Sequence, residues 1–104
     1  MAKPPKRFQR FQKEYKKVAD AYERLGTAVH EAGPLDEKTR ALVKLAISTG
    51  ARLEGAVRSH ARQAKDAGVT ASEMDHVVLL SLTTIGLPSM VAARTWVASA
   101  LAEA

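Results

Sequence analysis

The sequence has 104 residues, 46% of them hydrophobic and 26% charged, with a formal net charge of +5 and no cysteine. This length allows one ordinary domain, and the lack of cysteine excludes disulfide bonds, thiolate metal sites and thiol catalysis by this chain. No stretch approaches the roughly 20 apolar residues of a membrane span, and residues 1–17 lack the apolar run of a signal peptide, so we expect a cytoplasmic protein.

The N-terminal segment predicts one helix that begins after Pro5 and ends near Glu31, before Gly33 and Pro34. Its large apolar residues follow one another in alternating steps of three and four. They are Phe8, Phe11, Tyr15, Val18, Tyr22, Leu25 and Val29. Such a heptad stripe is a seam for another helix, in the same chain or in a neighbouring one.

The positive charge of the chain is concentrated at its N-terminus. Residues 1–17 carry seven lysines and arginines and a single glutamate, so the rest of the chain has almost no net charge. Most of these cations fall beside the apolar stripe and are expected to form its solvated flanks. We therefore predict only weak, salt-sensitive binding to nucleic acid, with no specific nucleic-acid partner and no membrane partner.

Four further helices are expected after residue 35. The second begins at Asp36 as its N-cap and ends near Gly50, and the third covers residues 51–67 and ends at Gly68, a glycine suited to a left-handed C-cap. Thr70 and Glu73 form a capping box that starts the fourth helix.

Gly86, Leu87 and Pro88 end the fourth helix, and the fifth runs from about Ser89 to the end of the chain. The prediction is a single all-α domain over residues 1–104, made of a basic heptad helix over 1–33 and the remaining helices over 35–104. Nineteen alanines leave little apolar area to bury in one short chain. We therefore expect the protein to form a homo-oligomer.

Histidine is the residue type of this chain that titrates near neutral pH, and it occurs at positions 30, 60 and 76. His30 suits the negative end of a helix, and His76 is expected at a surface or an interface. His60 shares a helical stripe with apolar residues, so its imidazole must find a partner or line a cavity. The histidine spacing offers no metal site, and no phosphate-binding glycine loop is present, so we expect no cofactor.

Residues 35–40 (LDEKTR), 45–48 (LAIS) and 60–73 (HARQAKDAGVTASE), with the break at Gly86–Pro88, resemble the carboxymuconolactone decarboxylase and alkylhydroperoxidase-D-like family. The resemblance covers residues 35–96. It implies an all-α fold of that type and assembly into trimers or hexamers. It also implies a functional role for His60.

The chain departs from the peroxidase members of that family at three positions. Those members carry a Cys-x-x-Cys pair where this sequence has Leu53 and Ala56, and a glutamate where it has Ala41. Peroxide reduction by disulfide cycling needs both thiols, so we expect no alkylhydroperoxidase activity.

Decarboxylase members need no cysteine, because lactone decarboxylation is a problem of proton transfer. The candidate acid/base is His60, and the candidate carboxylate-binding residues are Arg52, Arg58 and Lys44. The alternative is a non-catalytic oligomeric scaffold or binding module of the same fold.

Overall fold

The computed structural model of the chain describes residues 4–103, and every regular element within them is a helix. In chain order these are α1 (Lys6–Glu14), α2 (Lys16–Glu31), α3 (Glu37–Ala51), α4 (Glu54–Asp66), α5 (Ala71–Leu80), α6 (Leu82–Ile85) and α7 (Leu87–Glu103). The all-α prediction is confirmed. The prediction of five helices is wrong, because two of the expected helices are interrupted.

The described chain divides into two compact units. The first, formed by α1 and α2, ends at Leu35, and the second, formed by α3 to α7, begins at Asp36. This boundary lies beside the one expected between residues 33 and 35.

In the first unit, the expected single helix is broken at Tyr15, whose backbone leaves the helical region (φ −130°, ψ 56°). The helical pattern of backbone hydrogen bonds continues through the break. The Tyr15 N–H still donates to the Phe11 carbonyl, and the Tyr15 carbonyl accepts from the Ala19 N–H. The break separates Lys13 from Lys16 and Lys17, like charges that a continuous helix would stack on one side. It also leaves the Phe11 and Tyr15 rings in contact, with centroids 5.8 Å apart.

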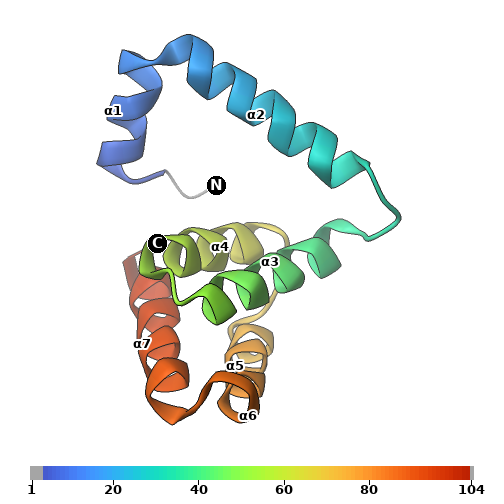
Figure 1. Ribbon diagram of the computed structural model, residues 1–104, viewed down its shortest axis with the longest axis vertical. Coiled ribbons are helices and arrows are strands. Elements are labelled where there is room, and N and C mark those ends of the chain that lie inside the picture. The colour runs from blue at the N-terminus through green and yellow to red at the C-terminus, as the bar shows by residue number, and fades with distance from the viewer. Residues whose placement is uncertain (1–3, 104) are drawn as a thin grey trace. The chain divides into compact units, whose positions relative to one another are not determined.

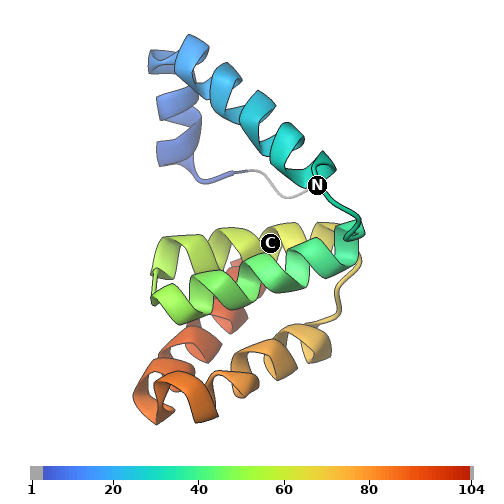
Figure 2. The ribbon, with the colours of Figure 1, turned by 45° about the vertical axis from the view of Figure 1, so that its right-hand side comes forward.

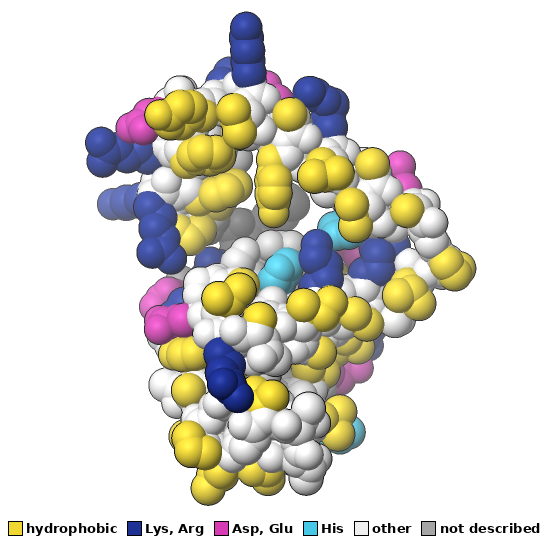
Figure 3. All heavy atoms as spheres, in the orientation of Figure 1, with side chains coloured by type: hydrophobic (Ala, Val, Ile, Leu, Met, Phe, Trp, Pro, Cys, Tyr) yellow, Lys and Arg dark blue, Asp and Glu magenta, His cyan; other side chains and the backbone are white. Residues whose placement is uncertain are grey.

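The apolar stripe of this unit is exposed along its whole length. The exposed fraction of its seven residues runs from 38% for Phe11 to 68% for Tyr22. Figure 3 shows hydrophobic side chains gathered along this part of the chain. Neither α1 nor α2 contains a buried residue, so the first unit does not bury the stripe by itself.

The second interruption lies at Ser81, between α5 and α6. The Ser81 N–H donates to the carbonyl of Val78, three residues back, and the Ser81 hydroxyl donates to the same oxygen at 2.6 Å. These bonds tighten the turn and end α5 at Leu80, so that Ser81 is the single residue between α5 and α6. Gly86 (φ 95°) then turns the chain into α7, as the Gly-Leu-Pro break predicts.

The second unit is built from two pairs of helices. The first pair is α3 and α4, which run side by side, and the second is α5 and α7. Across the pairs, α4 packs on α7 and α3 packs on α5 (Figures 1 and 2). The core between the pairs contains small and medium side chains, and its largest fully buried members are Leu45, Met74, Val57 and Val78.

Local signals fix the helix ends of this unit as expected. The Asp36 carboxylate accepts from the Thr39 N–H at 2.8 Å, and both bonds of the Thr70–Glu73 capping box are present. Gly68 has a φ of +88°, the left-handed conformation that favours glycine at a C-cap. A surface ion pair of 3.0 Å between Lys38 and Glu73 joins α3 to α5.

Candidate functional site

His60 and Lys44 lie at the same level of the α3–α4 pair. Only Arg52 and Leu53 separate the two helices, so they run antiparallel, and residues at equal distances from the turn lie side by side along the axis. Lys44 precedes Arg52 by eight residues and His60 follows Leu53 by seven. Both side chains are half-buried. The hairpin therefore places the candidate acid/base and one candidate carboxylate-binding residue at one level of the pair.

The position of His60 on α4 differs from the sequence interpretation. The buried residues of α4 are Val57, Ala61 and Ala64, and His60 lies at the edge of this stripe, about 60° around the helix from Val57. Leu53, the N-cap residue of α4 seven positions before His60, is 57% exposed. An imidazole at the edge of a core is shielded on one side and accessible on the other, which suits a group that exchanges protons with a small molecule.

Arg58 is held by three groups of the protein itself. Its Nε donates to Glu54 at 3.0 Å, and its Nη1 donates to the Ser99 hydroxyl at 3.0 Å and lies 3.6 Å from Glu103. These contacts tie α4 to α7 through a half-buried guanidinium. The geometry gives Arg58 a structural function in the α4–α7 contact.

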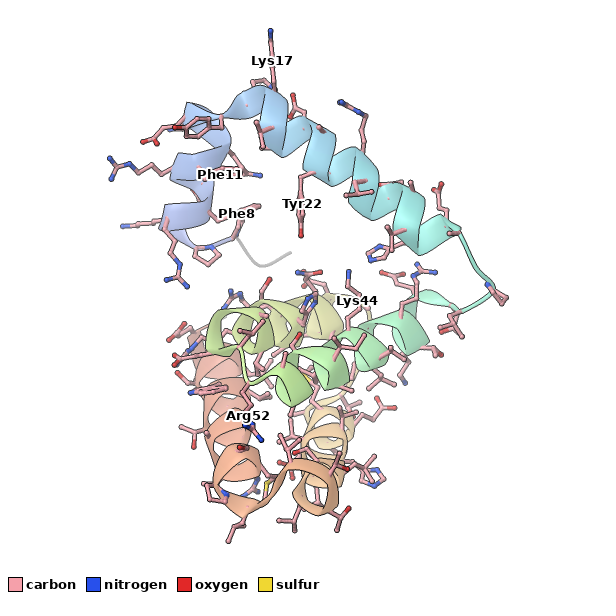
Figure 4. All side chains as sticks on the ribbon, in the orientation of Figure 1. Phe8, Phe11, Lys17, Tyr22, Lys44 and Arg52 are labelled. Atoms are coloured by element: carbon pink, nitrogen blue, oxygen red, sulfur yellow. The ribbon has the colours of Figure 1, made fainter. Side chains whose placement is uncertain are left out.

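Arg52 occupies the turn between α3 and α4. The helix was expected to end near Gly50, but α3 continues to Ala51, and Arg52 itself adopts the left-handed conformation (φ 59°). Its N–H closes the helix by donating to the carbonyl of Thr49 at 3.1 Å. Figure 4 shows Arg52 and Lys44 on opposite sides of α3. The structure therefore does not bring these two candidate residues together.

Thr49 is a polar residue that the sequence interpretation missed. It is 2% exposed, and its hydroxyl has no hydrogen-bond partner. Thr49 follows the buried Leu45 by four residues, and this spacing places both residues on one face of α3. The spacing was therefore a signal in the sequence that Thr49 is buried.

The perturbed carboxylates belong to helix ends. Hydrogen bonds from Thr39 lower the pKa of Asp36, and hydrogen bonds from Thr70 and then Lys38 lower the pKa of Glu73. Hydrogen bonding to Asp75 raises the pKa of Arg94. The two carboxylates cap helix ends, the Arg94–Asp75 pair joins α7 to α5, and none of the three shifted groups is a candidate site residue.

The two other histidines of the chain lie on α2 and α5, outside the α3–α4 pair. His30 is half-buried in the last turn of α2, and His76 is exposed on α5. No cluster of three metal-ligating side chains occurs in residues 4–103. An open surface hollow is lined by Asp20, Glu23, Arg24 and Thr27, which all belong to α2. Among the described helices, none is both long and apolar enough to cross a bilayer.

The sequence model of the carboxymuconolactone decarboxylase family matches residues 16–99, which include His60, Lys44 and the α3–α4 turn. The chain belongs to this family. The match begins at the first residue of α2, so it reaches further toward the N-terminus than the resemblance over residues 35–96 and leaves α1 outside. The resemblance inferred from the sequence is confirmed.

A curated relative of this carboxymuconolactone decarboxylase family chain is an uncharacterized protein of Haemophilus influenzae (strain ATCC 51907 / DSM 11121 / KW20 / Rd). The two are 41% identical over 59 residues, which cover 57% of this chain and 52% of the relative. The chain thus spans about half the length of the curated relative that it matches. The comparison with solved structures found no match.

Proposed function

We propose that the protein is a small-molecule lyase or decarboxylase that uses His60 as its acid/base. The observation that carries this proposal is the placement of two half-buried groups, the His60 imidazole and the Lys44 ammonium, at one level of the α3–α4 pair. An imidazole supplies a proton near neutral pH, and an ammonium attracts a carboxylate. Membership of the carboxymuconolactone decarboxylase family supports the same chemistry.

The proposed step is a decarboxylation with protonation at carbon. The bond between the substrate carbon and its carboxylate breaks, the electron pair stays on the carbon, and CO₂ leaves. His60 in its imidazolium form transfers a proton to that carbon, which completes the C–H bond, and water then reprotonates the imidazole. Lys44 holds a second anionic group of the substrate. We assign the binding role to Lys44 because it is half-buried and lies at the level of His60 on the α3–α4 pair.

A panel of carboxylated γ-lactones tests this proposal, with CO₂ release as the readout. His60→Ala should lower turnover at least about a hundredfold, the usual contribution of a general acid. His76→Ala is the matched control, because it removes an exposed histidine of α5 and should leave turnover unchanged. Unchanged turnover in His60→Ala would remove His60 from the mechanism.

The alternative function is a non-catalytic scaffold or binding module of the same fold. It is favoured by the apolar surroundings of His60 on α4, whose buried residues are Val57, Ala61 and Ala64. Absence of CO₂ release from the whole panel, in a correctly folded wild-type protein, would favour this alternative.

Alkylhydroperoxidase activity is not expected in either case. Disulfide cycling needs a thiolate and a resolving thiol, and the chain contains no cysteine. Hydroperoxide consumption with a dithiol reductant should therefore equal the rate without protein. Turnover that scales with protein concentration and survives metal chelation would contradict this reasoning.

A further inference from the structure

The His60 imidazole has a positive charge as its neighbour across the α3–α4 pair. Lys44 and His60 lie at one level of this antiparallel hairpin, and both side chains are half-buried. The axes of two packed helices lie about 8–10 Å apart, a gap that a lysine side chain and an imidazole bridge between them. Figure 4 shows Arg52 on the opposite side of α3, so Arg52 lies away from Lys44. The charge of Lys44 is therefore placed to act on the protonation of His60.

The other charged groups of the helices packed on α4 lie mainly in ion pairs or at helix ends. On α4 the positions three and four residues from His60 are uncharged, and they hold Ala56, Val57, Gln63 and Ala64. On α3, Arg40 lies one turn before Lys44 and on the same side of the helix. The ion pairs join Glu73 to Lys38, Asp75 to Arg94, and both Glu54 and Glu103 to Arg58. Glu37 starts α3 and Asp66 ends α4. Within residues 36–103, the charges on the His60 side of the hairpin are thus those of Lys44 and Arg40.

A bound anion changes the electrostatic balance at the imidazole. The Lys44 ammonium repels a second positive charge, and the apolar residues beside His60 on α4 exclude water that would solvate that charge. A carboxylate bound to Lys44 adds a negative charge that attracts the imidazolium form of His60. By linkage, whatever favours the imidazolium in the complex also makes the protonated site bind the anion more tightly.

We propose that substrate binding and protonation of His60 are coupled, so that the anionic group held by Lys44 draws a proton from water onto the imidazole. This inference rests on the proposed function, because it concerns the same acid and the same anionic group. The coupling loads the general acid in the complex, where its proton is transferred to the substrate carbon. Anion binding should therefore strengthen as pH falls through the titration midpoint of His60.

Proton NMR titration of the histidine ring signals tests the influence of Lys44 in the protein without substrate. Lys44→Met keeps an unbranched side chain and removes the charge, so the His60 midpoint should rise by at least about 0.5 pH unit. Lys65→Met is the matched control, because it removes the same charge from an exposed position of α4 that is five residues from His60, and it should leave the midpoint unchanged. An unchanged midpoint in Lys44→Met, or equal shifts in the two variants, would overturn the proposal.

Calorimetric titration with paraconate, a γ-lactone that carries one carboxylate, tests the coupling itself. Near neutral pH, the binding heat of the wild type should depend on the ionisation enthalpy of the buffer, which reports proton uptake, and this dependence should vanish in His60→Gln. Absence of paraconate binding, or binding without proton uptake, would overturn the coupling. The proposed function has a separate readout: CO₂ release without proton uptake contradicts the coupling alone, and proton uptake without CO₂ release from the lactone panel contradicts the proposed decarboxylation alone.

Discussion

Arg58→Met tests whether this arginine serves the fold or a ligand. Methionine keeps an unbranched apolar stem and removes the guanidinium, whose side chain is 24% exposed. The hydrogen bond from the charged guanidinium to Ser99 contributes about 1.5 kcal/mol. The Glu54 pair, four residues away on the same helix, contributes about 0.4 kcal/mol. Glu103, 64% exposed and 3.6 Å away, adds little.

The expected loss is therefore about 2 kcal/mol of unfolding free energy, or a Tm lower by about 10 °C. Urea and thermal unfolding followed by circular dichroism measure it. All variants are compared at one protein concentration, because stability depends on concentration in any protein that self-associates. Ser99→Ala removes the long-range bond, together with the longer 3.4 Å bond from Ser99 to Glu103, and should cost about 1 kcal/mol. A loss below about 0.5 kcal/mol in Arg58→Met, together with a higher KM for a carboxylated substrate, would refute the structural assignment and return Arg58 to the binding site.

Three further predictions follow from the fold and the charge distribution. The folded-state pKa values of Asp36 and Glu73 are lowered, so their stabilisation is present above the ordinary carboxyl pKa near 4 and is lost as pH falls through the folded values; acid titrations of stability should be flatter in Asp36→Asn and Glu73→Gln, and an unchanged slope would contradict the assignment. Gly68→Ala should cost about 1 kcal/mol in urea unfolding because of its φ of +88°, whereas Gly50→Ala, inside α3 with open space around the added carbon, should gain up to about 1 kcal/mol; equal effects would refute the conformational argument. Duplex and single-stranded DNA should bind weakly at low salt and lose affinity steeply near physiological salt; submicromolar binding at the higher salt would instead make the basic N-terminus a dedicated nucleic-acid surface.

Most of the fold was predictable because its signals are local. Asp36, Gly68 and the Thr70–Glu73 box determine helix ends through contacts within a few residues, and such contacts are visible in a sequence. The interruption at Tyr15 was not predictable from the heptad pattern, which continues through it without a change of step. At Ser81 the deciding bonds reach back three residues instead of four, and serine tolerates either geometry.

The candidate site was less predictable, because its geometry depends on distant residues. Arg58 meets Ser99 across 41 positions of the chain, a distance that no spacing rule covers. Arg52 is drawn into the left-handed turn because α3 continues one residue beyond Gly50. The position of His60 at the edge of the α4 stripe required knowledge of which α4 residues face α7. The sequence motif located the histidine, and only the fold located its neighbours.

The Glu73 carboxylate has a consequence for how the protein folds. One oxygen accepts from the Thr70 N–H at the start of α5, and the other lies 3.0 Å from Lys38 of α3. The same side chain thus caps α5 and contacts a residue of α3 that lies 35 positions earlier in the sequence. A substitution at Glu73 should slow the formation of α5 and its docking on α3 together, because α5 has no second acidic residue in its first turn to take over the role. The carboxylate couples a local folding event to a long-range one, so this part of the domain should gain its order in one cooperative step.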